Sequence, residues 1–79
     1  MNILYFGPAR DCTGLGAEDI TLEEGTTVSG LWDVLIARHP RLAECRAISR
    51  VAIDMSYATG DEVVSGAAEI AIIPPVAGG

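Results

Sequence analysis

The clearest helical pattern in the sequence lies at residues 26–40, which read TTVSGLWDVLIARHP. The apolar residues here are spaced by three and four positions, which places them on one stripe of a helix; they are Val28, Leu31, Trp32, Leu35 and Ile36. Thr26 or Thr27 can supply the N-cap oxygen, and Pro40 ends the helix because the residue before proline avoids helical geometry. We therefore expect one amphipathic helix that packs on a sheet.

Strand patterns lie on both sides of this helix in the sequence. Strands are predicted at residues 2–6, 17–23, 51–54, 62–64 and 69–73, a loop at residues 10–16, and a short helical turn at residues 42–45. The last strand, EIAII, is almost continuously apolar, which is typical of a strand buried on both faces. The first and last strands are the most apolar, so we expect them side by side in the centre.

One helix packed across one mixed sheet of four to five strands is the economical way to bury these faces. The sequence thus predicts an α+β fold with the β-grasp, or ubiquitin-like, architecture. The chain has 79 residues, which suits a single domain. We divide it into a folded part at residues 1–73 and an extended C-terminal tail at residues 74–79.

The amino-acid composition argues against several classes of protein and of function. Apolar residues make up 49% of the chain, which excludes intrinsic disorder, and no apolar run is long enough to span a membrane. The net charge is −6, all five basic residues are arginines, and lysine is absent. This balance argues against nucleic-acid binding and suits a partner with a basic surface.

The metal-ligating residue types are few. Cys12, Cys45 and His39 are the only cysteines and histidine, whereas a structural zinc site normally takes four such ligands, so we expect no metal. We expect two reduced thiols, and hence a cytoplasmic protein. The sequence by itself also allows a disulfide between them. His39 is expected to place its charge near the C-terminal carbonyls of the helix.

The unusual feature is the C-terminal sequence PPVAGG. No motif of a serine hydrolase, zinc protease or nucleotide-binding loop occurs, so the chain is not expected to catalyse a reaction alone. Pro74 and Pro75 stiffen the exit from the last strand, and Gly78 and Gly79 are slim enough to enter a narrow channel. A frayed terminus would more often be polar. We interpret the tail, about 20 Å long when extended, as a device that delivers its carboxylate to another protein.

Three segments together resemble the small subunit of molybdopterin synthase, the MoaD family of ubiquitin-like sulfur carriers. They are LYFGPARDCTG, TTVSGLWDVLIARHP and SGAAEIAIIPPVAGG, which span nearly the whole chain. Ala67 and Ala68 replace an acidic turn residue of that family, and Asp54 stands where Asn is frequent. The paired prolines and paired glycines, two residues apart, are the specific part of the resemblance.

The resemblance implies chemistry at Gly79. A MoeB-like activating enzyme would use ATP and Mg²⁺ to adenylate its carboxylate, sulfur would replace AMP, and the thiocarboxylate would donate sulfur to a pterin precursor. Gly78 would provide clearance, and Pro74, Pro75, Val76 and Ala77 would aim and seat the tail in the large synthase subunit. The implied assembly is a heterotetramer of two small and two large subunits. Exposed apolar residues of the sheet, Phe6 among them, would form the docking patch, and no cofactor would stay bound.

Three alternatives remain open. The chain resembles, less specifically, sulfur carriers for thiazole synthesis, tRNA thiolation or cysteine synthesis. It also resembles ubiquitin-like modifiers, which are joined through a terminal glycine to lysines of other proteins. The third alternative is a structural β-grasp module with an inert tail.

Overall fold

The computed structural model describes residues 1–64, 66 and 69–74 of the chain. Its elements follow in the order β1 (Asn2–Tyr5), α1 (Pro8–Thr13), β2 (Ala17–Asp19), α2 (Val28–Arg38), the 3₁₀ helices η1 (Pro40–Glu44) and η2 (Arg46–Ile48), β3 (Arg50–Ile53), β4 (Ser56–Ala58) and β5 (Glu69–Ile73). Among these residues, every helix falls short of the length and apolar character that crossing a bilayer requires.

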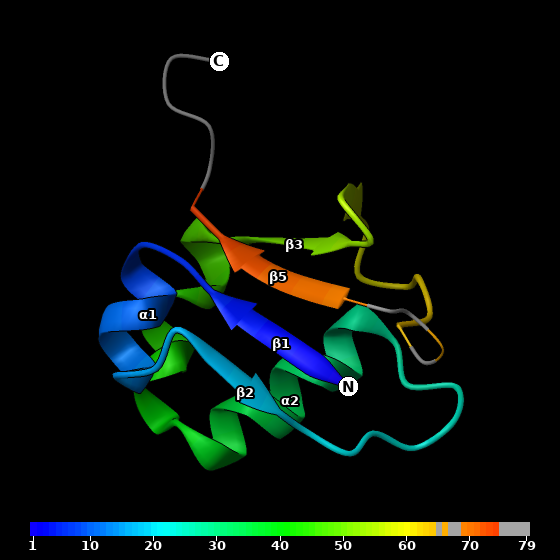
Figure 1. The fold of residues 1–79 in the computed structure, drawn as a ribbon, viewed down its shortest axis with the longest axis horizontal. Coiled ribbons are helices and arrows are strands. Elements are labelled where there is room, and N and C mark those ends of the chain that lie inside the picture. The colour runs from blue at the N-terminus through cyan, green and yellow to red at the C-terminus, as the bar shows by residue number, and fades with distance from the viewer. Residues whose placement is uncertain (65, 67–68, 75–79) are drawn as a thin grey trace.

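The five strands form one mixed sheet in the order β2-β1-β5-β3-β4. The central strands β1 and β5 are parallel, and the other neighbouring pairs are antiparallel. Helix α2 lies across one face of the sheet (Figure 1). The predicted β-grasp architecture is confirmed, as is the central pairing of the first and last strands.

The core lies between α2 and the sheet. Alternate residues of β1 and β5 point into it, so that Ile3, Ile70 and Ile72 are completely buried. The helix contributes most of the predicted stripe, namely Val28, Leu31, Trp32 and Leu35, with Ile36 at its margin. Thr27 is the N-cap residue, and its hydroxyl accepts a hydrogen bond of 3.1 Å from the Gly30 N–H.

The loop predicted at residues 10–16 is wrong over its first part, because α1 occupies Pro8–Thr13. This helix begins with a proline, whose fixed φ suits the first helical position, and ends at Gly14 in the left-handed conformation. It is only six residues long and buries a single residue, Ala9. A helix of this length leaves no apolar periodicity in the sequence.

The predicted strand at residues 62–64 is also wrong. The fourth strand is β4, at Ser56–Ala58, and Val63 makes only an isolated bridge to Thr27. A two-residue turn joins β3 to β4, and both Asp54 and Met55 have positive φ angles there. Turns of this kind usually contain Asn-Gly or Asp-Gly, so Asp-Met gives no hairpin signal.

Two further strand predictions need correction. The strand expected at residues 17–23 is shorter, since β2 ends at Asp19. The last strand was expected to be buried on both faces, yet only Ile70 and Ile72 are buried, whereas Ala71 and Ile73 remain partly exposed. The reason is that α2 covers one face of the sheet only.

A cluster of polar side chains ties β2 to the end of α2. The Glu18 carboxylate accepts hydrogen bonds from the Tyr5 hydroxyl at 2.8 Å and from Arg38 Nη2 at 2.9 Å, and it lies 2.8 Å from His39 Nε2. The expected role of His39 is therefore corrected, since its ring binds a carboxylate across the fold. Burial raises the pKa of Glu18, but the hydrogen bonds from His39, Arg38 and Tyr5 outweigh burial and lower it to about 2.

The hydrogen-bonded Glu18 cluster makes the free energy of unfolding depend on pH in the acid range. The pKa of Glu18 falls from an ordinary 4.5 to about 2 on folding, so between these values the unfolded chain binds the extra proton. Its stabilisation is present above pH 4.5 and is lost as the pH falls toward 2. We expect Glu18→Gln to lower the free energy of unfolding by about 1–2 kcal/mol at neutral pH and to flatten this acid limb in urea titrations. Glu24→Gln, at an exposed site, should keep the limb; an unchanged limb in Glu18→Gln would contradict the assignment.

Candidate functional site

The predicted site is the C-terminal tail, of which the structure describes only the first residue. Pro75, Val76, Ala77, Gly78 and Gly79 lie outside the described residues. Pro74 is described and is exposed at the end of β5. The geometry available for the site is therefore that of its base, where the tail leaves the sheet.

The base is a strand that is held along both edges. Residues of β5 pair with β1 on one side and β3 on the other, up to the register Ile73↔Arg50. The Phe6 N–H donates a further hydrogen bond of 3.0 Å to the Ile72 carbonyl oxygen, just beyond β1. A central strand cannot fray as an edge strand does, so Pro74 starts from a fixed position and direction.

Gly7 supports the base from the neighbouring strand. Its φ of +56° and ψ of −131° belong to a region that residues with a Cβ rarely adopt. A Cβ built on Gly7 would lie 3.1 Å from Pro74 Cγ and 3.3 Å from Pro74 Cδ. The missing side chain thus lets the proline ring lie against the turn that leads into α1.

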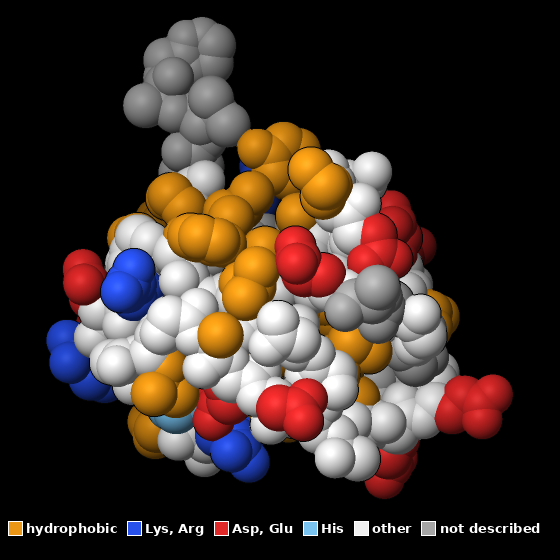
Figure 2. All heavy atoms as spheres, viewed as in Figure 1, with side chains coloured by type: hydrophobic (Ala, Val, Ile, Leu, Met, Phe, Trp, Pro, Cys, Tyr) orange, Lys and Arg blue, Asp and Glu red, His pale blue; other side chains and the backbone are white. Residues whose placement is uncertain are grey.

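The sheet face opposite α2, which we call the open face, is apolar and begins beside this base. The strand register and alternation place two kinds of residue on it: the apolar Leu4, Phe6, Ala17, Ala52, Tyr57, Ala71 and Ile73, and the polar Asn2, Asp19, Arg50 and Glu69 towards its ends. Phe6 is 44% and Tyr57 53% exposed. Figure 2 shows hydrophobic side chains gathered on this side of the molecule, reaching to the point where the tail begins. A surface of this kind typically marks a protein interface.

A charged residue of the open face, Arg50, lies near the base. The Arg50 guanidinium lies 5.6 Å from the centre of the Tyr57 ring, a distance at which the cation is attracted to the ring face. Arg50 also pairs in register with Ile73, the last residue before the tail. The contact restrains the Tyr57 ring at the margin of the open face and adds a positive charge there.

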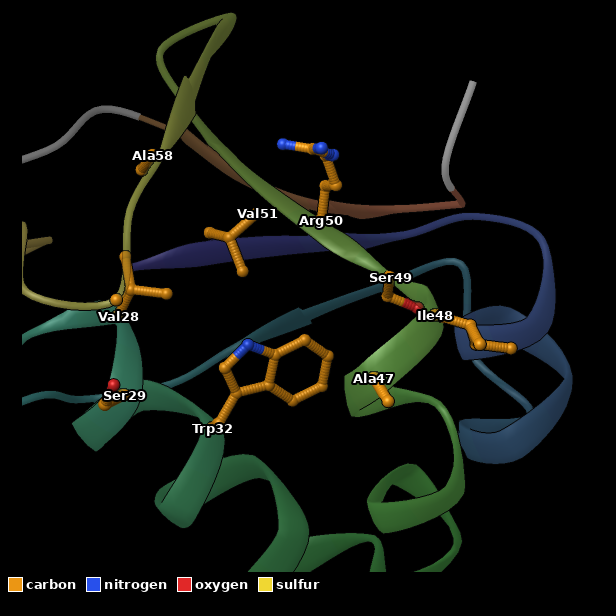
Figure 3. Close-up of a pocket in the computed structure, with 10 residues that line it drawn as sticks. Val28, Ser29, Trp32, Ala47, Ile48, Ser49, Arg50, Val51 and Ala58 are labelled. Carbon is orange, nitrogen blue, oxygen red and sulfur yellow. The ribbon is translucent and has the colours of Figure 1, made fainter. Parts of the chain in front are cut away.

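A pocket of about 480 Å³ lies on the other side of the sheet, between the start of α2 and β3. Trp32 and Val51 face one another across it (Figure 3). The Ser49 hydroxyl is buried and has no hydrogen-bond partner among the described residues. Arg50 is the only charged residue in its lining, so its serine hydroxyls have no acidic or histidine side chain beside them in the pocket.

The acidic and metal-ligating side chains of the described residues do not gather into a metal site. None of their His, Cys, Asp and Glu side chains form a group of three that could hold a metal ion. The Glu18 carboxylate is already engaged by Tyr5, Arg38 and His39, which makes it a structural group. What this part of the chain provides is a rigid base for the tail and an apolar surface beside it.

The sequence alone missed two parts of this base. The nearness of Gly7 to Pro74 depends on the pairing of β1 with β5, which brings the two together. The contact of Arg50 with Tyr57 depends on the hairpin between β3 and β4, and that hairpin has no recognisable turn signal. Phe6, in contrast, was expected in the docking patch and does lie on the open face.

The chain is similar in sequence to known sulfur carriers. The model of the ThiS family matches residues 3–79. Proteins named molybdopterin synthase sulfur carrier subunit align over the whole chain. The sequence identity is 36% for the protein of Mycobacterium tuberculosis, 34% for that of Homo sapiens and 33% for that of Arabidopsis thaliana. The alignments cover 96%, 93% and 82% of the length of these relatives, in the same order. These matches include the stretch that the structure does not describe.

Solved structures share the fold. A Pyrococcus furiosus protein with the provisional name molybdopterin converting factor, subunit 1, superposes with a TM-score of 0.81 at 27% identity over 95% of both chains. Small archaeal modifier protein 1 of Haloferax volcanii superposes with a TM-score of 0.80 at 23% identity, also over 95% of both chains. The second likeness bears on the fold alone.

The contact between Gly7 and Pro74 is testable. We expect Gly7→Ala to lower the free energy of unfolding by about 2 kcal/mol, because the new Cβ meets Pro74 and the backbone is unsuited to alanine. Gly14→Ala should cost about 1 kcal/mol, since its φ is also positive but no atom lies within 4 Å of its built Cβ.

A double-mutant cycle separates the two effects in urea titrations. In a Pro74→Ala background, where Cγ and Cδ are absent, Gly7→Ala should cost less than in the wild-type chain. An equal cost in both backgrounds would show that the two residues are not in contact.

Proposed function

The chain belongs to the ThiS family, and from this premise we propose that it is the sulfur-carrying subunit of a molybdopterin synthase. The observation that carries the proposal is the full-length match to sulfur carrier subunits of that enzyme. The C-terminal PPVAGG and the apolar face beside its base support the same reading.

The chemistry we propose takes place on Gly79. An activating enzyme similar to MoeB joins its carboxylate to AMP, using ATP and Mg²⁺, because a free carboxylate is a poor electrophile. Sulfur then displaces AMP and leaves a thiocarboxylate, whose sulfur attacks a pterin precursor. Glycine suits this position because no Cβ crowds attack at the carbonyl carbon. The absence of lysine leaves no side-chain amine in the chain to capture the activated acyl group.

The partner we propose for the open face is the large subunit of the synthase, with two copies of each subunit in the assembly. Phe6 and Tyr57 offer it large apolar side chains that are partly exposed in the isolated chain. The net charge of −6 would speed encounter with a basic surface on that partner. Gly78 would give clearance in the partner's pocket, while Pro74, Pro75, Val76 and Ala77 aim and seat the tail. We place this activity in the cytoplasm.

The intact mass of the chain, isolated from its own cells without added thiols, tests the proposal directly. A species heavier by the difference between sulfur and oxygen, located at Gly79, would support a sulfur carrier. Conversion of a cyclic pterin precursor with the large subunit would then separate this role from sulfur carriers of other pathways. Recovery of the chain only as branched conjugates, joined through Gly79 to lysines of other proteins, would instead indicate a modifier.

Removal of Gly79 should abolish sulfur transfer without unfolding the domain. Among the described residues the buried core ends at Ile72, so we expect the melting temperature of the truncated chain to equal that of the intact chain. Pterin conversion should fall to the level seen without any carrier, because the new terminal carboxylate, on Gly78, stops one residue short of the position at which Gly79 would be activated and presented. A truncated chain that still supports conversion would overturn the assignment of Gly79.

The substitution Phe6→Glu tests the proposal that the open face binds the large subunit. A carboxylate placed in an apolar interface loses its hydration, so affinity for the large subunit should fall at least about tenfold in calorimetric titration. Val63→Glu is the matched control, since Val63 is 53% exposed and bridges to Thr27 beside the start of α2. Equal affinities of the two variants, with both chains folded, would place the interface elsewhere.

A further inference from the structure

The two cysteines, 33 residues apart in sequence, meet in the fold. Cys12 belongs to α1, and Cys45 follows η1. Their Sγ atoms are 2.8 Å apart, although no bond joins them. Two reduced, unrelated thiols were expected, and the expectation missed this contact because nothing in their spacing indicates it.

The backbone around each thiol is fixed by local structure. Cys12 lies within the helical turn that follows the buried Ala9. The Cys45 N–H donates a hydrogen bond of 2.9 Å to the carbonyl oxygen of Leu42, which is completely buried. A disulfide needs Sγ atoms about 2.05 Å apart, so the two sulfur atoms have to approach by less than about 1 Å.

The two thiols differ in accessibility. Cys45 is 3% exposed, whereas Cys12 is partly exposed at the surface of α1. Burial, together with the hydrogen bond to Cys12, raises the pKa of Cys45 to about 11. Cys45 therefore stays protonated at neutral pH, and an oxidant from solvent reaches Cys12 first.

We propose that Cys12 and Cys45 are a modification site, at which a small-molecule disulfide such as oxidised glutathione installs an intramolecular disulfide. The Cys12 thiolate attacks one sulfur of the oxidant, which breaks its S–S bond and releases one thiol. Cys45 transfers its proton to solvent, attacks the Cys12 sulfur and releases the second thiol. The chain loses two hydrogen atoms and two electrons, and the oxidant is reduced to two thiols.

The new bond would join α1 to the segment between η1 and η2. It closes a loop that contains β2 and α2, so it restricts the unfolded chain and stabilises the folded one. Cys45 packs in the core on the side of the sheet that α2 covers, away from the open face. The oxidised chain thus keeps its docking surface, and the inference stands whether or not the proposed function is correct.

The experiment exposes the purified full-length chain to oxidised glutathione and follows intact mass and alkylation. The wild-type chain should lose two hydrogen atoms, resist alkylation at both cysteines after unfolding in denaturant and yield a Cys12–Cys45 linked peptide after digestion. Its melting temperature should rise by roughly 10 °C and return on reduction. A chain that stays fully alkylatable, or that gives only linked dimers, would overturn the proposal.

Two matched variants test the order of attack. Cys45→Ala keeps the accessible thiol and should stop as a stable glutathione adduct on Cys12. Cys12→Ser keeps only the buried thiol and should remain unmodified over the same period. If the wild-type chain also accumulates the adduct instead of losing two hydrogen atoms, the pair does not close and the proposal fails.

Discussion

The parallel pairing of β1 with β5 is the contact on which the rest of the molecule depends. It joins the first strand of the chain to the last, so the core closes only when both are in place. Because β3 holds the other edge of β5, the tail begins at the centre of the sheet. The same pairing brings Gly7 against Pro74 and thereby fixes the position from which the tail starts.

A single main helix cannot cover both faces of a five-stranded sheet, and the consequence of this imbalance is the open face. The covered face holds the completely buried residues Ile3, Ile70 and Ile72. The middle of the other face carries apolar side chains where a free-standing antiparallel sheet would carry polar ones. Burying them in the proposed partner would add free energy to that of the small core of a 79-residue chain.

The sequence predicted the elements whose burial follows a regular period. The α2 stripe and the apolar residues of β1 and β5 were found because a helix or a strand repeats its buried positions. The prediction from sequence failed where the element is short or a turn has unusual residues. Helix α1 was missed because it buries only Ala9. The β3–β4 hairpin was missed because its turn uses Asp54 and Met55 at positive φ. In the candidate site, the tail was identified from composition, whereas the contacts of its base come from strand pairing that no local pattern records.

The nearness of the open face to the tail has a kinetic consequence for the proposed carrier. Phe6 and Ile73 lie on that face, and Ile73 immediately precedes Pro74. Once the face is bound, entry of the tail into the partner becomes an intramolecular step, which is favoured by a high effective concentration. Specificity then resides in the sheet, because a slim tail of proline, small and glycine residues offers few groups to recognise. A partner that bound only the tail would lack this advantage, which gives a physical reason for the proposed carrier to combine an apolar sheet face with a tail of small residues.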